Sequence, residues 1–378
     1  MNKIDFLLKL LLTLLKYKLA CCISFFFPQK NLWLIAERGV DARDNGYHFY
    51  RYLRSFHPDI KTIYIISEKS NDINKFHNGD SVIRTNSIRH YLALARASHV
   101  ISTHICGYAP DAYTFNYLDK KLNIFNKKKK IFLQHGIIKD NIEALHAENV
   151  NLDLFICGAY PEFLYVSQHY NHPIDVVRYT GLCRYDSLND FHCEKVILIM
   201  PTWRANALKG NFVQSEYFIT YSKLICNDKL SYLAEKFGYT VIFYPHHEFQ
   251  KYISEFMRLP IPAHINIASR EYDVQDLLKS SRLLITDYSS VYFDFAYMHK
   301  PIIFYQFDKE KYHYKKGYFQ EENIGDVVLT VDQLLESLLY YLSNGCEVKP
   351  THLANIDKLF VYRDRLNCER VFNAIMSV

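Results

Sequence analysis

The feature that most constrains the fold of this chain is a repeated order of apolar run, polar turn and amphipathic segment. It is clearest at residues 283–296, where an apolar run leads into a hydroxyl-rich turn and then into apolar residues at helical spacing. Such a run predicts a buried strand, and Ser289 or Ser290 suits the N-cap of the following helix. Free backbone N–H groups and the helix dipole favour an anion at this turn, with Thr286, Ser289 and Ser290 as hydroxyl donors. An ordinary capped helix is the alternative interpretation.

The same order recurs along the chain and divides it into two halves. Short apolar runs predict strands at residues 32–36, 62–66, 99–102, 131–134, 154–157, 196–200, 241–244, 283–286 and 301–305, and helical patterns lie at residues 47–56, 88–97 and 331–342. This alternation predicts parallel sheets in an α/β fold. Because a polar stretch at residues 186–194 separates the halves, we expect two doubly wound Rossmann-type domains, residues 29–188 and 189–378, facing a central cleft. Ligands bind outside the carboxyl ends of the strands in such folds.

Composition excludes several classes of protein. The chain has 378 residues, of which 49% are hydrophobic and 22% charged, and these values are typical of a folded protein with more than one domain. The net charge of +5 suits an anionic ligand or a membrane surface, but it is too small to predict nucleic-acid binding. The nine cysteines are odd in number and form no CxxC pair, which indicates reduced thiols in a cytoplasmic protein.

Residues 1–28 form a separate, leucine-rich segment. Asp5, Lys9, Thr13 and Lys16 fall along one face of a helix, and leucines cover the rest. A narrow polar stripe with lysines is typical of an amphipathic helix in the membrane interface. A spanning helix would bury a lysine at roughly 2.5–3.5 kcal/mol, and no small-residue cleavage site supports a signal peptide. We therefore expect peripheral or monotopic attachment to a membrane surface through residues 1–28.

Two segments place histidines directly after predicted strands. His135 precedes Gly136; an imidazole that titrates near neutrality suits a general base, and a glycine permits close approach of a ligand. A structural histidine in a turn is the alternative. His246 and His247 follow another strand, but neighbouring side chains on an extended segment point to opposite faces, so a shared metal ion is not expected. One histidine that donates to phosphate is the preferred interpretation.

Charged turns follow other predicted strands. Arg204 lies just behind the run at 196–200 and Arg184 lies near the domain break, and arginine is well matched to bidentate phosphate contact. The charged loop at residues 37–46 is either a solvated surface or part of an acceptor site. The lysine run at residues 127–130 is typical of a solvated loop, with contact to anionic lipid as the alternative.

Several cofactor and metal signatures are absent from the sequence. No GxxxxGK[ST] segment is present, no GxGxxG follows the first strand, and neither HExxH nor paired carboxylates at metal-binding spacing occur. These absences exclude P-loop hydrolases, dehydrogenases and zinc hydrolases. We expect neither a metal ion nor a cofactor.

Taken in order, the polar segments resemble the CDP-glycerol glycerophosphotransferase family, which includes polymerases and primases of teichoic acids and related capsule polymerases. The resemblance covers residues 30–375 and is carried by the segments Gln134-His135-Gly136, Thr180–Asp186, Pro201-Thr202-Trp203-Arg204, Ile285–Ser290 and Lys300–Tyr305. Two departures stand out. His246 is followed by His247 where the family has proline, and the family's C-terminal aspartate-glycine-asparagine segment is replaced near residues 364–370.

The resemblance implies a GT-B architecture with an acceptor-side N-terminal domain and a CDP-binding C-terminal domain. It implies that an acceptor hydroxyl, on a lipid-linked or glycan molecule, attacks the β-phosphorus of a CDP-linked polyol phosphate, preferably glycerol phosphate, and that CMP leaves. It makes His135 the expected base and His246 the second catalytic residue. The donor-binding residues it implies are Gly136, Arg184, Thr202, Arg204, Thr286, Asp287, Ser289, Ser290 and Asp294. The expected acceptor-side residues are Glu37, Arg38, Asp41, Asp44 and Asn45.

Two other classes of function stay open at this point. A GT-B glycosyltransferase that uses a nucleotide sugar would release a nucleoside diphosphate, whereas polyol-phosphate transfer releases a monophosphate. A non-catalytic membrane adaptor would tolerate the loss of either histidine. The resemblance favours polyol-phosphate transfer in teichoic-acid-like or capsular polymer synthesis, at the cytoplasmic face of the cell membrane.

Overall fold

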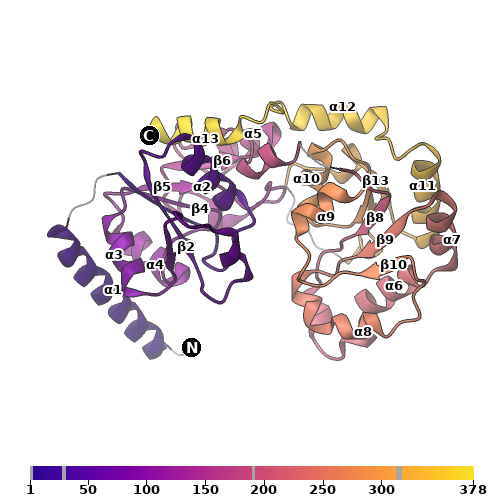
Figure 1. Ribbon diagram of the computed structural model, residues 1–378, viewed down its shortest axis with the longest axis horizontal. Coiled ribbons are helices and arrows are strands. Elements are labelled where there is room, and N and C mark those ends of the chain that lie inside the picture. Colours follow the sequence, from indigo (N-terminus) through magenta and orange to yellow (C-terminus); the bar gives the residue numbers. More distant parts are fainter. Residues whose placement is uncertain (1–2, 28–30, 190–191, 312–316) are drawn as a thin grey trace. The chain divides into compact units, whose positions relative to one another are not determined.

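The computed structural model describes residues 3–27, 31–189, 192–311 and 317–378, and the chain forms two compact units (Figure 1). Unit 1 comprises residues Met1–Ser187 and Phe360–Val378, and unit 2 comprises Leu188–Leu359. Each unit is built on one parallel sheet with helices on its faces. The expected α/β fold with two Rossmann-type domains is therefore confirmed.

The sheet of unit 1 has seven strands in the order β3-β2-β1-β4-β5-β6-β7. These are β1 (Leu32–Ala36), β2 (Lys61–Ile66), β3 (Val82–Arg84), β4 (His99–Ser102), β5 (Lys129–Phe132), β6 (Leu154–Cys157) and β7 (Val177–Tyr179). The strand order reverses between β1 and β4, where Ala36 lies opposite Ser102. The carboxyl ends of strands beside such a reversal are where ligands bind in this class of sheet.

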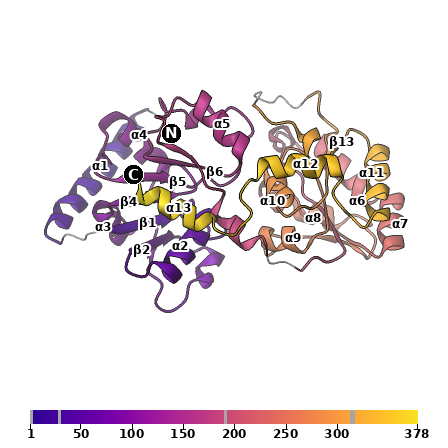
Figure 2. The ribbon, with the colours of Figure 1, turned by 90° about the horizontal axis from the view of Figure 1, so that it is seen from above.

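Helices cover both faces of the unit 1 sheet, as Figures 1 and 2 show. Trp33 and Ile35 pack toward α2 (Asn45–Phe56) and α13 (Asn367–Met376), whereas Leu34 and Ala36 face the opposite side. Buried strands with apolar side chains on both faces are typical of parallel sheets. The remaining helices of unit 1 are α1 (Lys3–Phe25), α3 (Ile88–Arg96), α4 (Ala112–Leu122), α5 (Tyr160–His169), and the 3₁₀ turns η1 (Asn71–Lys75), η2 (Glu143–Leu145) and η3 (Cys183–Ser187).

The sheet of unit 2 has six strands in the order β10-β9-β8-β11-β12-β13, with its reversal between β8 and β11. The strands are β8 (Val196–Ile199), β9 (Thr240–Phe243), β10 (Ile265–Ile267), β11 (Leu283–Thr286), β12 (Ile302–Tyr305) and β13 (Asp326–Val328). The helices are α6 (Glu216–Ile225), α7 (Asp228–Phe237), α8 (Ile253–Met257), α9 (Val274–Ser280), α10 (Val291–Tyr297), α11 (Val331–Ser343) and α12 (Pro350–Leu359). The 3₁₀ turns are η4 (Ala205–Leu208), η5 (Phe212–Gln214), η6 (His247–Tyr252) and η7 (Glu321–Asn323).

The C-terminal residues pack on unit 1 and not on the second domain, where the sequence order places them. Asp186 accepts hydrogen bonds from the backbone N–H groups of Asn367, at 2.9 Å, and Cys368, at 2.8 Å, which begin α13. Val371 and Ile375 are fully buried in the core beside α2. The expected range of 189–378 for the second domain therefore ends too late, because the apolar face of α13 completes the core of unit 1.

Helix α1 lies along α3 and α4 within unit 1 (Figure 1). Lys9 and Thr13 of its polar stripe face the rest of the unit, whereas Asp5 and Lys16 are exposed. Lys9 pairs with Asp111, the N-cap of α4, at 2.7 Å, and Thr13 is only 7% exposed. The leucines on the opposite side point outward, and five of them are each more than half exposed: Leu7, Leu8, Leu11, Leu15 and Leu19. Within the ranges that the structure describes, no helix is long and apolar enough to cross a membrane.

The lysine run at residues 127–130 is only partly a solvated loop. Lys128 is buried and donates to the carbonyl oxygens of Ala95 and Ala97 at 3.0 and 2.7 Å, where it caps the end of α3. Lys130 is buried as well and pairs with Asp119 at 3.1 Å. The prediction of a solvated loop is wrong for these two side chains, because each finds buried acceptors on a neighbouring helix.

Candidate functional site

The carboxyl ends of β1, β4 and β5 bring several predicted segments of unit 1 together. The loop from Glu37 to Asp44 leaves β1 and leads into α2, and His135 follows β5. Asn45 donates through Nδ2 to the carbonyl oxygen of Gln134 at 2.8 Å, and its Oδ1 accepts from the backbone of Arg184 at 3.0 Å. Three segments that are far apart in the sequence are thus joined by one buried asparagine.

The buried carboxylate of Glu37 binds the backbone of the loop after β1. Its carboxylate is 2% exposed and accepts the backbone N–H groups of Arg43, Asp44 and Tyr47 at 3.1, 2.7 and 3.2 Å. Burial and the nearby Asp44 carboxylate raise the pKa of Glu37 to about 8, against the opposing effect of these hydrogen bonds. Glu37 therefore shapes the loop and is not presented to an acceptor, contrary to the role expected from the sequence.

Asp44 and Arg184 form an ion pair beside His135. Arg184 Nη1 lies 2.7 Å from Asp44 Oδ1 and donates to the backbone oxygen of His135 at 3.1 Å. The arginine side chain is 10% exposed and that of Asp44 is 20% exposed. Arg184 and Gly136, which were expected to bind the donor, thus lie on unit 1 with the acceptor-side residues.

His135 is exposed at this end of the sheet. Partial desolvation by the surrounding protein lowers the pKa of His135, opposed by the Asp44 carboxylate and aided by Arg184. The ring is stacked on that of His104, which follows β4, with centroids 4.4 Å apart and an angle of 17° between the planes. A neutral imidazole that solvent can reach is what a general base requires.

The two other predicted acceptor-side residues pair with each other at the surface. Arg38 Nε donates to Asp41 Oδ2 at 2.8 Å, and the Arg38 side chain is about half exposed at 49%. In the turn that carries His135, the left-handed residue is Gln134, with φ of 59°, and Gly136 is buried. The backbone freedom of Gly136 is therefore not what forms this turn.

In unit 2, the segments behind β8, β11 and β12 meet at Arg204. Its guanidinium donates to Asp287 at 2.8 Å and to Asp308 at 2.6 and 3.1 Å, and the side chain is 10% exposed. Burial alone would lower the pKa of Arg204, but the two carboxylates outweigh it and raise the pKa. Asp287 is fully buried and also accepts the backbone N–H of Thr202 at 2.8 Å. Arg204 and Asp287 therefore join these loops to each other, and the phosphate contact expected for them stays a prediction.

The hydroxyl-rich turn after β11 divides into buried and accessible parts. Thr286 is 1% exposed and donates to the carbonyl oxygen of Met200 at 2.7 Å, so it does not present its hydroxyl to a ligand as expected. Asp294 is buried in the first turn of α10. Ser289 and Ser290 are half-buried, and Ser290 is the N-cap of α10 without a side-chain capping bond. Thr202 places a buried hydroxyl nearby that has no hydrogen-bond partner among the described residues.

His246 follows β9 and is half-buried, while its neighbour His247 is exposed. The Nδ1 atom of His246 accepts the backbone N–H of Glu248 at 3.3 Å, so the other ring nitrogen carries the hydrogen in the neutral ring. Burial and the adjacent His247 lower the pKa of His246 to about 4. The ring is stacked on Trp203, with centroids 6.3 Å apart. His246 is thus a neutral donor near pH 7.

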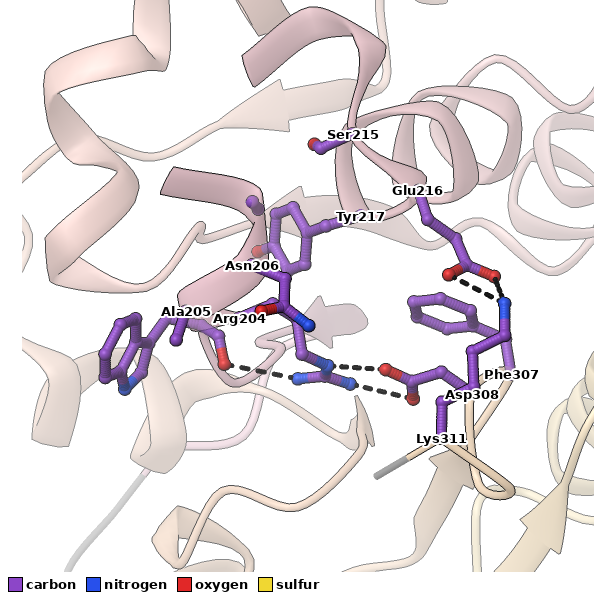
Figure 3. Close-up of a pocket in the computed structure, with 11 residues that line it drawn as sticks. Arg204, Ala205, Asn206, Ser215, Glu216, Tyr217, Phe307, Asp308 and Lys311 are labelled. Carbon is purple, nitrogen blue, oxygen red and sulfur yellow. Dashed lines mark hydrogen bonds and ion pairs between the residues drawn. The ribbon is translucent and has the colours of Figure 1, made fainter. Parts of the chain in front are cut away.

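A cavity of about 390 Å³ lies beside Trp203 in unit 2 (Figure 3). Figure 3 shows Arg204 and Asp308 bonded to each other, and Lys311 bonded to Glu216 at 2.8 Å. The lining combines aromatic and polar side chains: Trp203, Arg204, Ala205, Asn206, Ala207, Ser215, Glu216, Tyr217, Phe307, Asp308 and Lys311. Pockets with this mixture of side chains suit a small polar molecule with a flat ring.

Two residues of these clusters were not singled out from the sequence. His104 stands alone after β4 without a glycine beside it, and Asp308 lies 104 positions from Arg204. A histidine shortly after a predicted strand was the available signal for His104. No signal in the sequence links Asp308 to Arg204. In the ranges that the structure describes, no group of three or more histidine, cysteine, aspartate or glutamate side chains is arranged to hold a metal ion.

Comparison with known proteins places these clusters in a family context. The profile of the family described as CDP-Glycerol:Poly(glycerophosphate) glycerophosphotransferase matches residues 17–174 and 185–377. The minor teichoic acid biosynthesis protein GgaB of Bacillus subtilis is 34% identical over 368 residues, which are 93% of this chain and 40% of that protein. The teichoic acid poly(glycerol phosphate) polymerase of the same organism is 24% identical over 399 residues, which are 96% of this chain and 51% of that protein. The chain thus spans about half or less of the length of these relatives.

A solved structure shares the fold. The structure of the wall teichoic acid polymerase TagF aligns with 100% of this chain and 98% of its own, at a TM-score of 0.69 and 19% sequence identity. At this identity the likeness establishes the architecture alone, namely two Rossmann-like domains of GT-B type.

Proposed function

This chain belongs to the CDP-Glycerol:Poly(glycerophosphate) glycerophosphotransferase family, and from that premise we propose that it transfers glycerol phosphate from CDP-glycerol to a hydroxyl acceptor in teichoic-acid-like or capsular polymer synthesis. The acceptor oxygen forms a bond to the β-phosphorus of the donor, the bond between that phosphorus and the CMP oxygen breaks, and CMP leaves. The acceptor's proton passes to a base. The observation that carries the proposal is the neutral His135 ring at the carboxyl edge of the unit 1 sheet, in a chain of this family.

Unit 1 supplies the base in this proposal. Desolvation keeps His135 neutral, so its free ring nitrogen is ready to take the acceptor proton near pH 7. Arg184 bonds the backbone oxygen of His135 and is itself fixed by Asp44, which makes both of them positioning residues. Arg38 and Asp41 at the surface are the groups available to contact the acceptor.

Unit 2 binds the donor in this proposal. His246, Ser289 and Ser290 are only half-buried and offer one N–H and two O–H donors to the diphosphate oxygens. Hydrogen bonds aimed at the charge that develops on a phosphoryl group stabilise the transition state. The cavity beside Trp203 is the place for the nucleoside, because it adjoins His246 through the stacked rings. Arg204, Asp287 and Thr286 position these loops.

We also propose that α1 lies on the cytoplasmic face of the cell membrane, where a lipid-linked acceptor would be found. The helix leaves a row of leucines exposed, and burying one such side chain contributes about 1.5–3 kcal/mol. Exchanging Leu11 and Leu15 for serine should weaken binding to anionic lipid vesicles by at least about 10-fold. Exchanging Ile174, which is 91% exposed elsewhere on unit 1, is the matched control. Equal binding by all variants would contradict the membrane role.

The transfer reaction is tested by supplying CDP-glycerol and CDP-ribitol separately with candidate acceptors and measuring CMP. Release from one donor identifies the polyol, and release from neither contradicts the proposal. A nucleoside diphosphate released from a nucleotide sugar would instead indicate a glycosyltransferase. His135→Ala should lower kcat about 10²- to 10⁴-fold, whereas His77→Ala, at an exposed histidine before β3, should leave it unchanged. Near-wild-type release by His135→Ala would exclude the base role.

A further inference from the structure

Two histidine rings lie face to face at the ends of adjacent strands in unit 1. Ser102 at the end of β4 is paired with Phe132 at the end of β5, and His104 and His135 follow these residues. Their ring centroids are 4.4 Å apart and the planes differ by 17°. Such a spacing is direct ring contact, so neither imidazole can tilt toward the other.

Thr103 contacts the ring of His104 and influences the titration of His135. Its hydroxyl lies 3.0 Å from Nδ1 of His104. Its backbone favours the protonated form of His135 and so opposes the lowering of the His135 pKa by burial. One ring nitrogen of a neutral His135 bears the lone pair that a base uses.

Burial and the neighbouring charged groups keep His104 uncharged. Burial, the adjacent His135 ring and Arg38 lower the pKa of His104 to about 3. The groups that act on His135 are Asp44, Arg184 and Arg38 besides the Thr103 backbone. His104 therefore presents a flat, neutral surface to the base at any pH at which the enzyme would work.

We propose that His104 is a positioning residue, whose stacked ring holds His135 in the orientation in which its free nitrogen faces the acceptor hydroxyl. This inference rests on the proposed function, since it assigns His135 as the base. His104 takes up no proton in this role. Its own nitrogen is used to fix its ring against Thr103.

Three variants separate stacking from other roles. His104→Ala removes the ring, His104→Gln keeps a polar side chain without a ring, and His104→Phe keeps a ring without a nitrogen. If stacking positions the base, His104→Ala and His104→Gln should lower kcat about 10- to 100-fold with little change in the KM for the donor. His104→Phe should stay within about threefold of the wild type, since the flat surface remains. A loss in His104→Phe as large as that in His104→Ala would overturn positioning by stacking.

The second readout is the titration of His135 in the full chain, followed by NMR and assigned by comparison with His135→Asn. Removing the ring in His104→Ala or His104→Gln should admit water and return the pKa of His135 toward the ordinary histidine value of about 6.5. The acid limb of the pH–rate profile should move upward with it, while His104→Phe keeps the wild-type titration. An unchanged titration in both ringless variants would overturn the inference. A wild-type chain that releases no CMP would contradict the proposed function instead, and the titration would still test the ring pair.

Discussion

Exchanging Asp287 for asparagine should destabilise unit 2, because it removes one charge of a buried ion pair. The carboxylate is fully buried and accepts from the backbone N–H groups of Thr202 at 2.8 Å and Tyr288 at 2.6 Å. It also faces the guanidinium of Arg204 at 2.8 Å. An amide of the same shape can still accept the backbone bonds, but it removes the negative charge opposite a buried arginine.

The size of the effect follows from burial. Removing one partner of a buried ion pair typically costs 3–5 kcal/mol, because the other charge is left without compensation, so a value of about 3 kcal/mol is expected where a second carboxylate remains. Asp308, with its side chain 10% exposed, still pairs with Arg204 here. In a unit of this size, a loss of about 3 kcal/mol lowers the midpoint of thermal unfolding by roughly 6–12 °C.

Urea unfolding of the full chain measures this loss. The chain has 2 Trp, at positions 33 and 203, so fluorescence has one reporter in each unit, and the transition of Trp203 should move in Asp287→Asn. Asp332→Asn, at an exposed aspartate in the first turn of α11, should change the unfolding free energy by less than about 0.5 kcal/mol. A loss below about 1 kcal/mol in Asp287→Asn would refute the reasoning that the buried pair joins these loops.

Three further outcomes are expected. Burial raises the pKa of Glu162 from 4.5 to about 7, so between these pH values the folded form holds a proton that the unfolded chain releases. The unfolding free energy should therefore fall by about 1–3 kcal/mol as pH rises through this window. Urea titrations of Glu162→Gln should lose this pH dependence, and a retained pH dependence would contradict its assignment to Glu162. Asp186→Ala should lower the unfolding free energy by about 0.5–2 kcal/mol and should speed amide hydrogen exchange in α13 but not in unit 2. Unchanged exchange in α13 would contradict the conclusion that Asp186 anchors this helix. Lys128→Met should lower the unfolding free energy measured in urea by about 1–3 kcal/mol, because two carbonyl oxygens at the end of α3 lose their donor. Lys127→Met, at an exposed position, should leave the unfolding free energy unchanged. Equal effects of the two exchanges would contradict the capping role of Lys128.

The central strands could be predicted because burial on both faces requires apolar runs. The predicted ranges for β1, β4, β6 and β11 coincide with the observed ones. The strands β3, β7, β10 and β13 were not predicted, since each has three residues and all four lie at sheet edges, where polar side chains are tolerated. Short strands at exposed sheet edges therefore escape prediction from the sequence, whatever the type of fold.

For the site, the sequence indicated which segments meet but not what each side chain does there. Parallel strands end at one edge, which brings His135 and the loop of Asp44 together. Asn45 then binds the backbone of Arg184 beside them. Whether Arg204 contacts a phosphate or a carboxylate depends on Asp287 and Asp308, which are 83 and 104 positions away. No local pattern carries that information, so the carboxylate partners of Arg204 could not be predicted from the sequence.

The return of residues 360–378 to unit 1 bears on how the chain is made. During synthesis, all of unit 2 leaves the ribosome before α13 does, so unit 2 can reach its folded state while unit 1 still lacks one covering helix. Until then Val371 and Ile375 do not cover the apolar surface formed by Trp33, Phe49 and Leu53. Translation that stops shortly before residue 360 would therefore yield a product with a folded unit 2 and an aggregation-prone unit 1. Such a product is a substrate for chaperones and proteases.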